Sequence, residues 1–131
     1  MYLFSAGSGK YAVTAKVHVL DEGVSVTLYG GERSHIGSVA IAVPRLSLAD
    51  PEVLSATTSV YNLVGHKDDE VARPAAEKIA KNINQVVVVT AGIHVEDATK
   101  EDIVILLKNT EELVDAIVVK LKKTFQRAKK L

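Results

Sequence analysis

The sequence predicts an α+β fold, in which helices near residues 68–84 and 110–128 cover one face of a largely antiparallel sheet of about five strands. The first half of the chain alternates apolar and polar residues at every second position, as half-buried strands do. After residue 68 the apolar residues recur every three or four positions, as in amphipathic helices. A valine run at 86–89 lies between the two helical patterns and has the uniform apolar character of a central buried strand.

Four strands are expected in the first half of the chain. Residues 11–20 and 24–29 both alternate, and the Asp-Glu-Gly turn between them predicts a hairpin. Residues 36–43 and 55–64 are rich in Val, Ile, Thr and Ser, which favour strands. We therefore expect these four segments to form an N-terminal meander.

The chain has the length of one domain with a single core. Residues 1–9 lack a sustained pattern and are expected to form a flexible N-terminal arm. Residues 129–131 are expected to form a frayed tail. The single α+β domain is therefore placed at residues 10–128.

The last third of the chain carries two helix-start signals. Thr99 and Asp102 resemble a capping box with Asp in place of the usual Glu, which predicts a short helix at 103–108, although this piece could also form a strand. Asn109 or Thr110 is expected to cap a separate final helix. Acidic residues at its start and basic residues at its end both match the helix dipole.

The composition excludes several classes of function. Sixteen basic and sixteen acidic residues cancel, so there is no general electrostatic attraction to nucleic acid or to a membrane surface. The absence of cysteine excludes disulfides, thiolate metal sites and a cysteine nucleophile. No stretch has the pattern of a signal peptide or a membrane span, so a cytoplasmic location without nucleic-acid or membrane partners is expected.

Three junctions combine glycine and histidine beside a predicted strand end: residues 31–37, 65–69 and 92–96. Each contributes one histidine: His35, His66 and His94. The start of one strand and the end of its antiparallel neighbour share an edge of the sheet, so the first two junctions can lie together. The third joins them if the valine-rich strand runs parallel to the strand at 55–64. We therefore expect one pocket, at strand ends where such folds display their chemistry.

The junction at 65–69 has the features of an anion site. The amides at a helix start carry partial positive charge, and Lys67 and Arg33 could add charged hydrogen bonds to a phosphate or carboxylate. The alternative is a simple helix cap, in which Asp68 satisfies those amides itself and Lys67 is solvated. The predicted binding residues are Arg33, His35, Gly65, His66, Lys67, Asp68, Asp69, Gly92 and His94.

A metal site is the second interpretation of the histidines. His35, His66 and His94 with a nearby carboxylate would suit Zn²⁺, Fe²⁺ or Ni²⁺. No two of them have a short regular spacing on one element, so the preferred assignment contains no metal. A His-dependent enzyme, possibly metal-dependent, acting on a phosphorylated or carboxylated small molecule remains an alternative function.

The motifs Gly-Gly-Glu-Arg-Ser-His-Ile-Gly (30–37), Gly-His-Lys-Asp-Asp (65–69) and Gly-Ile-His-Val-Glu-Asp-Ala-Thr (92–99) resemble the LpdD-like family of prenylated-flavin chaperones. The resemblance covers residues from about 10 to 125, and the family pattern has Asp where this chain has Glu96. It implies a fold related to that of the proteasome-assembly chaperones. It also implies a non-catalytic accessory protein that binds prenylated flavin mononucleotide (FMN) or FMN, or assists maturation of a partner decarboxylase.

On this resemblance the helix-start amides at 68–70 would hold the flavin phosphate, and Tyr29 and Tyr61 could form one wall against the ring. A second alternative is a proteasome-type assembly chaperone. Self-association as a homodimer is expected, through a sheet edge or the C-terminal helix.

Overall fold

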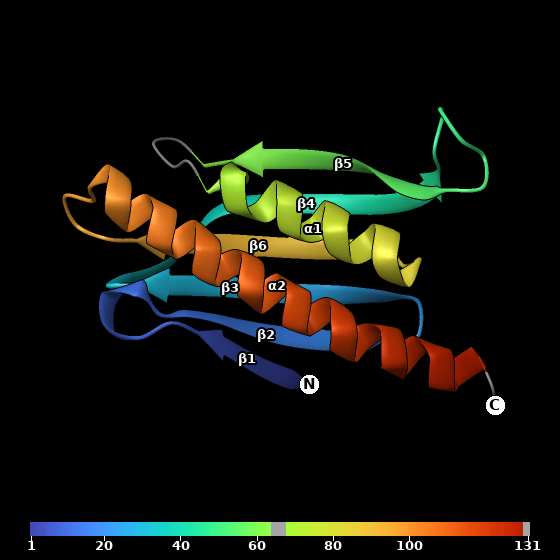
Figure 1. Ribbon diagram of the computed structural model, residues 1–131, viewed down its shortest axis with the longest axis horizontal. Helices are drawn as coiled ribbons and strands as arrows, with labels where there is room; N and C mark the ends of the chain where they lie inside the picture. The colour runs from blue at the N-terminus through green and yellow to red at the C-terminus, as the bar shows by residue number, and fades with distance from the viewer. Residues whose placement is uncertain (64–67, 130–131) are drawn as a thin grey trace.

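The computed structural model describes residues 1–63 and 68–129 and confirms the α+β class, with one mixed six-stranded sheet and two long helices (Figure 1). The strand order across the sheet is β1-β2-β3-β6-β4-β5. The elements are β1 (Tyr2–Ala6), the 3-10 turn η1 (Gly9–Tyr11), β2 (Val13–Leu20), β3 (Gly23–Gly31), β4 (Arg33–Leu46), β5 (Leu54–Asn62), α1 (Asp69–Ile83), β6 (Val87–His94) and α2 (Lys100–Lys129).

The valine-rich strand β6 lies between β3 and β4, so the expected meander is interrupted there. β6 pairs parallel to β3 and antiparallel to β4, and every other neighbouring pair is antiparallel. Both β5 and β6 run antiparallel to β4, so they share a direction, as the expected meeting of the junctions requires. The central position of β6 explains its apolar sequence.

The N-terminal residues form a strand rather than the expected flexible arm. β1 pairs antiparallel with β2, with Tyr2 opposite Val17 and Phe4 opposite Ala15. Tyr2 and Phe4 pack against the core. A strand of five residues is too short for alternation to stand out in the sequence, and it depends on β2 for its hydrogen bonds.

The C-terminal segment is one helix of 30 residues, not a short piece followed by a second helix. The capping box is confirmed: the amide of Thr99 donates to Asp102 Oδ2, and the amide of Asp102 donates to Thr99 Oγ1, both at 3.0 Å. Asn109 and Thr110 do not start a helix. The Thr110 hydroxyl donates to the carbonyl of Leu106 one turn earlier, and the Asn109 amide group donates to the carbonyl of Tyr11. The frayed-tail prediction falls mostly outside the described residues.

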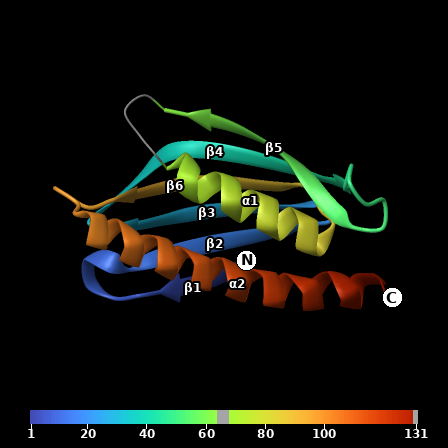
Figure 2. The same ribbon diagram turned by 45° about the horizontal axis from the view of Figure 1, so that its top comes forward.

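Both helices lie on the same face of the sheet, as predicted (Figures 1 and 2). α1 packs on β4, β5 and β6, whereas α2 packs on β1 and β2 and against α1. The core between the layers is aliphatic, with Leu28, Ile79 and Ile117 among its fully buried side chains. Neither of the two described helices is long and apolar enough to cross a membrane.

Candidate functional site

Two of the three predicted histidines meet where β4 begins and β6 ends. Arg33 on β4 pairs with His94 on β6. The rings of His35 and His94 lie edge to face, with centroids 6.3 Å apart. The third histidine, His66, lies outside the described residues together with Gly65 and Lys67, so the structure brings together two of the three junctions predicted to share one pocket.

Asp68 joins the start of α1 to both strands. It occupies the N-cap position, but its side chain makes no capping hydrogen bond. Its Oδ1 accepts the amide proton of Ile93, and its Oδ2 lies 3.0 Å from Nε2 of His35. The residue is 7% exposed, so these contacts are shielded from water. The interpretation of Asp68 as a simple cap for its own helix is therefore wrong.

Two glycines allow the strands to approach Asp68 this closely. β4 carries an irregularity between Ser34 and Ser38, where its pairing with β6 shifts register. A Cβ atom on Gly92 would lie 1.6 Å from the carbonyl oxygen of His35, and one on Gly37 would lie 1.9 Å from Oδ2 of Asp68. Gly92 is one of the predicted binding residues, and the space beside it is filled by the backbone of His35.

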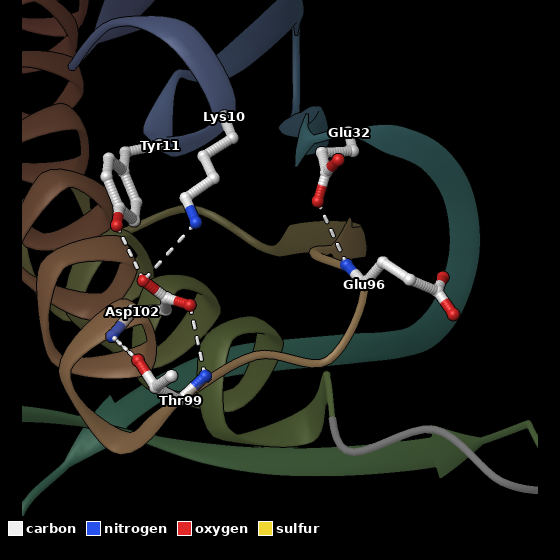
Figure 3. A network of polar contacts seen from close by, with 6 residues as sticks. All are labelled: Lys10, Tyr11, Glu32, Glu96, Thr99 and Asp102. Carbon is white, nitrogen blue, oxygen red and sulfur yellow. Dashed lines mark hydrogen bonds and ion pairs between the residues drawn. The ribbon is translucent and has the colours of Figure 1, made fainter.

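A second polar group lies at the outer rim of this junction and is centred on Glu96. Its Oε2 lies 3.0 Å from Nε2 of His94 and 3.5 Å from Nη2 of Arg33. Its amide donates to Glu32 Oε1 at 3.0 Å, which ties the segment after β6 to the turn before β4 (Figure 3). The hydrogen bond and charge of His94, with a smaller contribution from Arg33, lower the pKa of Glu96. Glu96 therefore orients His94.

Beside these residues lies a cavity of about 360 Å³, which we call the helix-side cleft. One end is polar and the body is aliphatic, so it suits a ligand with a broad apolar part and a few hydrogen-bonding groups. His94, held by Glu96, is the imidazole that can form a hydrogen bond with a ligand there. The lining residues are Asp68, Glu70, Val71, Ile93, His94, Val95, Ala98, Ile103, Leu106 and Leu107.

The start of α2, which forms one wall of this cleft, is anchored to the N-terminal part of the chain. Tyr11 donates its hydroxyl proton to Asp102 Oδ1 at 2.5 Å, and Lys10 lies 3.7 Å from the same oxygen (Figure 3). The Tyr11 hydrogen bond and the Thr99 amide lower the pKa of Asp102 to about 2. The same hydrogen bond raises the pKa of Tyr11. The carboxylate of Asp102 thus fixes the helix turn that carries Ile103.

Sequence reasoning identified the polar end of the cleft but missed its aliphatic body. Asp68 and His94 line the cleft, and His35 and Gly92 lie next to them without lining it. Arg33 lies at the exposed rim, with its side chain 70% exposed. Asp69 begins α1. The missed residues include Ile103, Leu106 and Leu107. The sequence feature that could have indicated them is the uninterrupted apolar run at 103–107, near a helix start.

Neither tyrosine suggested as a ring wall lines the helix-side cleft. Tyr29 follows Leu28, which is buried beneath the helices, so Tyr29 faces the opposite side of the sheet. Tyr61 is 72% exposed and lies opposite Val39 on β4. Within residues 1–63 and 68–129, no group of three or more His, Cys, Asp or Glu side chains could hold a metal ion. The metal alternative depends on His66, outside these ranges.

Comparison with known proteins supplies a family and a fold. Residues 7–122 match the sequence profile described as the prenylated flavin chaperone LpdD-like domain. No protein with a curated description matches in sequence. A chain in the structure titled "Crystal Structure of a Novel Chaperone Complex for Yeast 20S Proteasome Assembly" is similar in fold, with a TM-score of 0.56 and 16% identity over 92% of this chain and 99% of that one. At this identity the likeness concerns the fold alone.

Proposed function

Because this chain belongs to the prenylated flavin chaperone LpdD-like family, we propose that it is a non-catalytic accessory protein that binds prenylated FMN or FMN in the helix-side cleft. The observation that carries the proposal is the cleft itself, an aliphatic cavity of about 360 Å³ with hydrogen-bonding groups at one end. That volume lies within the ~300–1,000 Å³ typical of small-molecule sites. Asp68 and His94 supply hydrogen-bonding groups, and Ile103 and Leu106 supply apolar surface.

The flavin phosphate is proposed to lie at the start of α1 rather than inside the cleft. Among the described residues, the cleft lining contains the carboxylates of Asp68 and Glu70 but no Lys or Arg, so the interior does not attract a dianion. The Asp68 side chain makes no capping hydrogen bond, and the Asp68 carbonyl accepts from the amides of Val71 and Ala72, so the amides of residues 69 and 70 are the ones proposed to meet the phosphate. Gly65, His66 and Lys67 precede this turn and are the remaining proposed phosphate contacts.

The proposal includes two kinds of protein partner. One is a protein that receives the flavin from this chain, which the description of the family as flavin chaperones supports, and we propose that this protein is a decarboxylase. The other is a second copy of the chain, in a homodimer. An assembly-chaperone role of the proteasome type is the second candidate, and the shared fold is the observation that favours it.

Titration of the protein with FMN, followed by the change in flavin fluorescence, tests direct binding. Ile103 lines the cleft and is 44% exposed, so Ile103→Asp is tolerated by the fold but places a carboxylate against the ring. We expect at least a tenfold weaker dissociation constant, or about 1.4 kcal/mol, because burying this charge is unfavourable.

Val104→Asp is the matched control, because Val104 is the next residue on the helix, is 64% exposed and does not line the cleft. It should bind FMN as the wild type does. If the wild type fails to bind at high micromolar FMN, direct binding is excluded. Equal losses in the two variants would place the ligand elsewhere.

A further inference from the structure

A second cavity, of about 290 Å³, lies between α1 and α2, and we call it the interhelical groove. It adjoins the helix-side cleft, because Glu70, Val71 and Leu107 line both cavities. Both helices begin at the same end of the sheet and run in similar directions, so the groove continues the cleft along the two helices (Figure 1). The residues that line the groove but not the cleft are Pro74, Ala75, Lys78, Thr110, Glu111 and Val114.

Small side chains on α1 leave the groove open. Ala75 follows Val71 by one helical turn and lies on the same side of α1, and Pro74 beside it has a compact ring. Packed helices normally fill the space between them with side chains, because protein interiors are close-packed. The groove is therefore a space that an apolar part of a ligand can fill.

The lining of the groove is mostly aliphatic, and its polar groups are satisfied or exposed. The hydroxyl of Thr110 donates to a backbone carbonyl one turn earlier in α2, and Lys78 forms an ion pair with Asp115. Glu70 and Glu111 are exposed, so their carboxylates remain in contact with water. A neutral hydrocarbon is therefore favoured in the groove, whereas an anion would be repelled by these two carboxylates.

We infer that the interhelical groove binds the prenyl carbons of a prenylated flavin, and that it makes this chain prefer prenylated FMN to FMN. The inference rests on the proposed function, because it requires the flavin ring to lie in the helix-side cleft. The shared wall at Val71 and Leu107 then gives a substituent of the ring a direct route into the groove.

The chemistry of the prenyl unit matches that of the groove. The unit is a short, branched and uncharged hydrocarbon, and the groove offers it the aliphatic side chains of Val71, Ala75, Leu107 and Val114. Filling the groove removes apolar surface of both ligand and protein from water, which is favourable. FMN lacks this hydrocarbon, so it gains nothing from the groove.

The dissociation constants for FMN and prenylated FMN, measured by isothermal titration calorimetry, test the inference. We expect the wild type to bind prenylated FMN at least tenfold more tightly than FMN, a difference of about 1.4 kcal/mol. Equal affinities would overturn the inference and leave the flavin proposal intact. A wild type that binds neither flavin at high micromolar concentration would overturn both.

Pro74→Trp tests whether the groove causes the preference. Pro74 is exposed and lines the groove but not the cleft, so the indole ring fills the groove from the surface of α1. The ratio of the two dissociation constants should fall below about threefold. Lys81→Trp is the matched control, because it adds the same ring at an exposed position of α1 that lines neither cavity, and it should keep the preference. A preference that survives Pro74→Trp would place the prenyl group elsewhere.

Glu111→Trp fills the groove from the side of α2 and decides the question even if Pro74→Trp does not fold. Glu111 is exposed and lines the groove but not the cleft, so this variant should also lose the preference. Glu112→Trp is its control, because Glu112 is the next residue, is exposed and lines neither cavity. Equal preferences in these two variants would contradict the inference.

Amide chemical shifts of the labelled wild type give a readout that needs no variant. Ala75 and Val114 line the groove but not the cleft, so their amides should shift more with prenylated FMN than with FMN. The same shifts of these two amides with both flavins would overturn the inference.

Discussion

Each of the two helices has a buried aspartate at its start, but the two side chains bond to different parts of the molecule. Asp102 lies in the first turn of α2 and satisfies that turn, through its reciprocal hydrogen bonds with Thr99. Asp68 lies at the start of α1 but turns away from its helix, to the amide of Ile93 and the ring of His35. Both are 7% exposed. One buried carboxylate therefore closes a local motif, whereas the other joins three separate elements.

This difference decides how each residue contributes to the molecule. The Asp102 group fixes where α2 begins, so it positions one wall of the cleft. The Asp68 group fixes how α1 meets β4 and β6, so it determines whether the polar end of the cleft exists. Substitutions at the Asp68 group should therefore have the larger effects on stability.

The largest effect is expected for Asp68→Ala. It removes the acceptor for the Ile93 amide and the partner of His35 in a site with little access to water. We expect a loss of about 3 kcal/mol in the free energy of unfolding, measured by urea denaturation. Asp68→Asn keeps one carbonyl acceptor and should lose less. Equal stability of Asp68→Ala and wild type would show that this carboxylate does not join the elements.

Gly37→Ala tests the same group from the side of the strand. The added Cβ would lie 1.9 Å from Oδ2 of Asp68, so the carboxylate must move away from His35. We expect a loss of about 2 kcal/mol. Gly9→Ala is the control for removing a glycine, because a Cβ at Gly9 meets no atom within 4 Å, although its φ of +59° adds some strain. A Gly37 variant as stable as the Gly9 variant would contradict the close packing at Asp68.

Thr99→Ala should have a smaller effect, because it removes only the capping hydroxyl that accepts from the Asp102 amide. Loss of a helix cap costs about 1 kcal/mol. Thermal or urea unfolding gives this value. Thr99→Ser keeps the hydroxyl and should restore most of the stability, whereas a Ser variant as unstable as the Ala variant would argue against the cap.

The smallest effect concerns pH and the Tyr11 hydroxyl. The folded pKa of Asp102 is lowered to about 2, below an unfolded value of about 3.9, so the unfolded chain binds more protons between these values. The stabilisation is therefore complete above about pH 4 and is lost as the pH falls toward about 2. The stability difference between wild type and Tyr11→Phe should shrink below about pH 4. A difference that grows with acid would reverse the sign and refute the assignment.

Features that depend on local contacts could be predicted from the sequence, and features that depend on distant contacts could not. The Thr99–Asp102 capping box, helix α1 and the central position of β6 depend on neighbouring residues or on a local apolar pattern, and all three are confirmed. The short strand β1 and the continuity of α2 through Asn109 were missed, because both depend on contacts with distant segments. The side-chain amide of Asn109, for example, donates a hydrogen bond to the carbonyl of Tyr11 instead of capping a helix.

The candidate site shows the same limit. The meeting of His35 and His94 could be predicted, because strand direction determines which strand ends share an edge. The orientation of Asp68 could not, because its partners come from β4 and β6 rather than from its own helix. The aliphatic body of the cleft could not be predicted from the sequence either, because the exposed apolar residues on α2 have the same sequence pattern as core residues.

The central claim is that flavin binds on the helix side of the sheet, and amide chemical shifts of the labelled protein during addition of FMN test it most directly. The account predicts the largest shifts at Val71, His94 and Ile103, around the helix-side cleft. Shifts confined to Thr27, Tyr29 and Ile36, which line a shallow hollow on the side of the sheet that faces away from the helices, would contradict it.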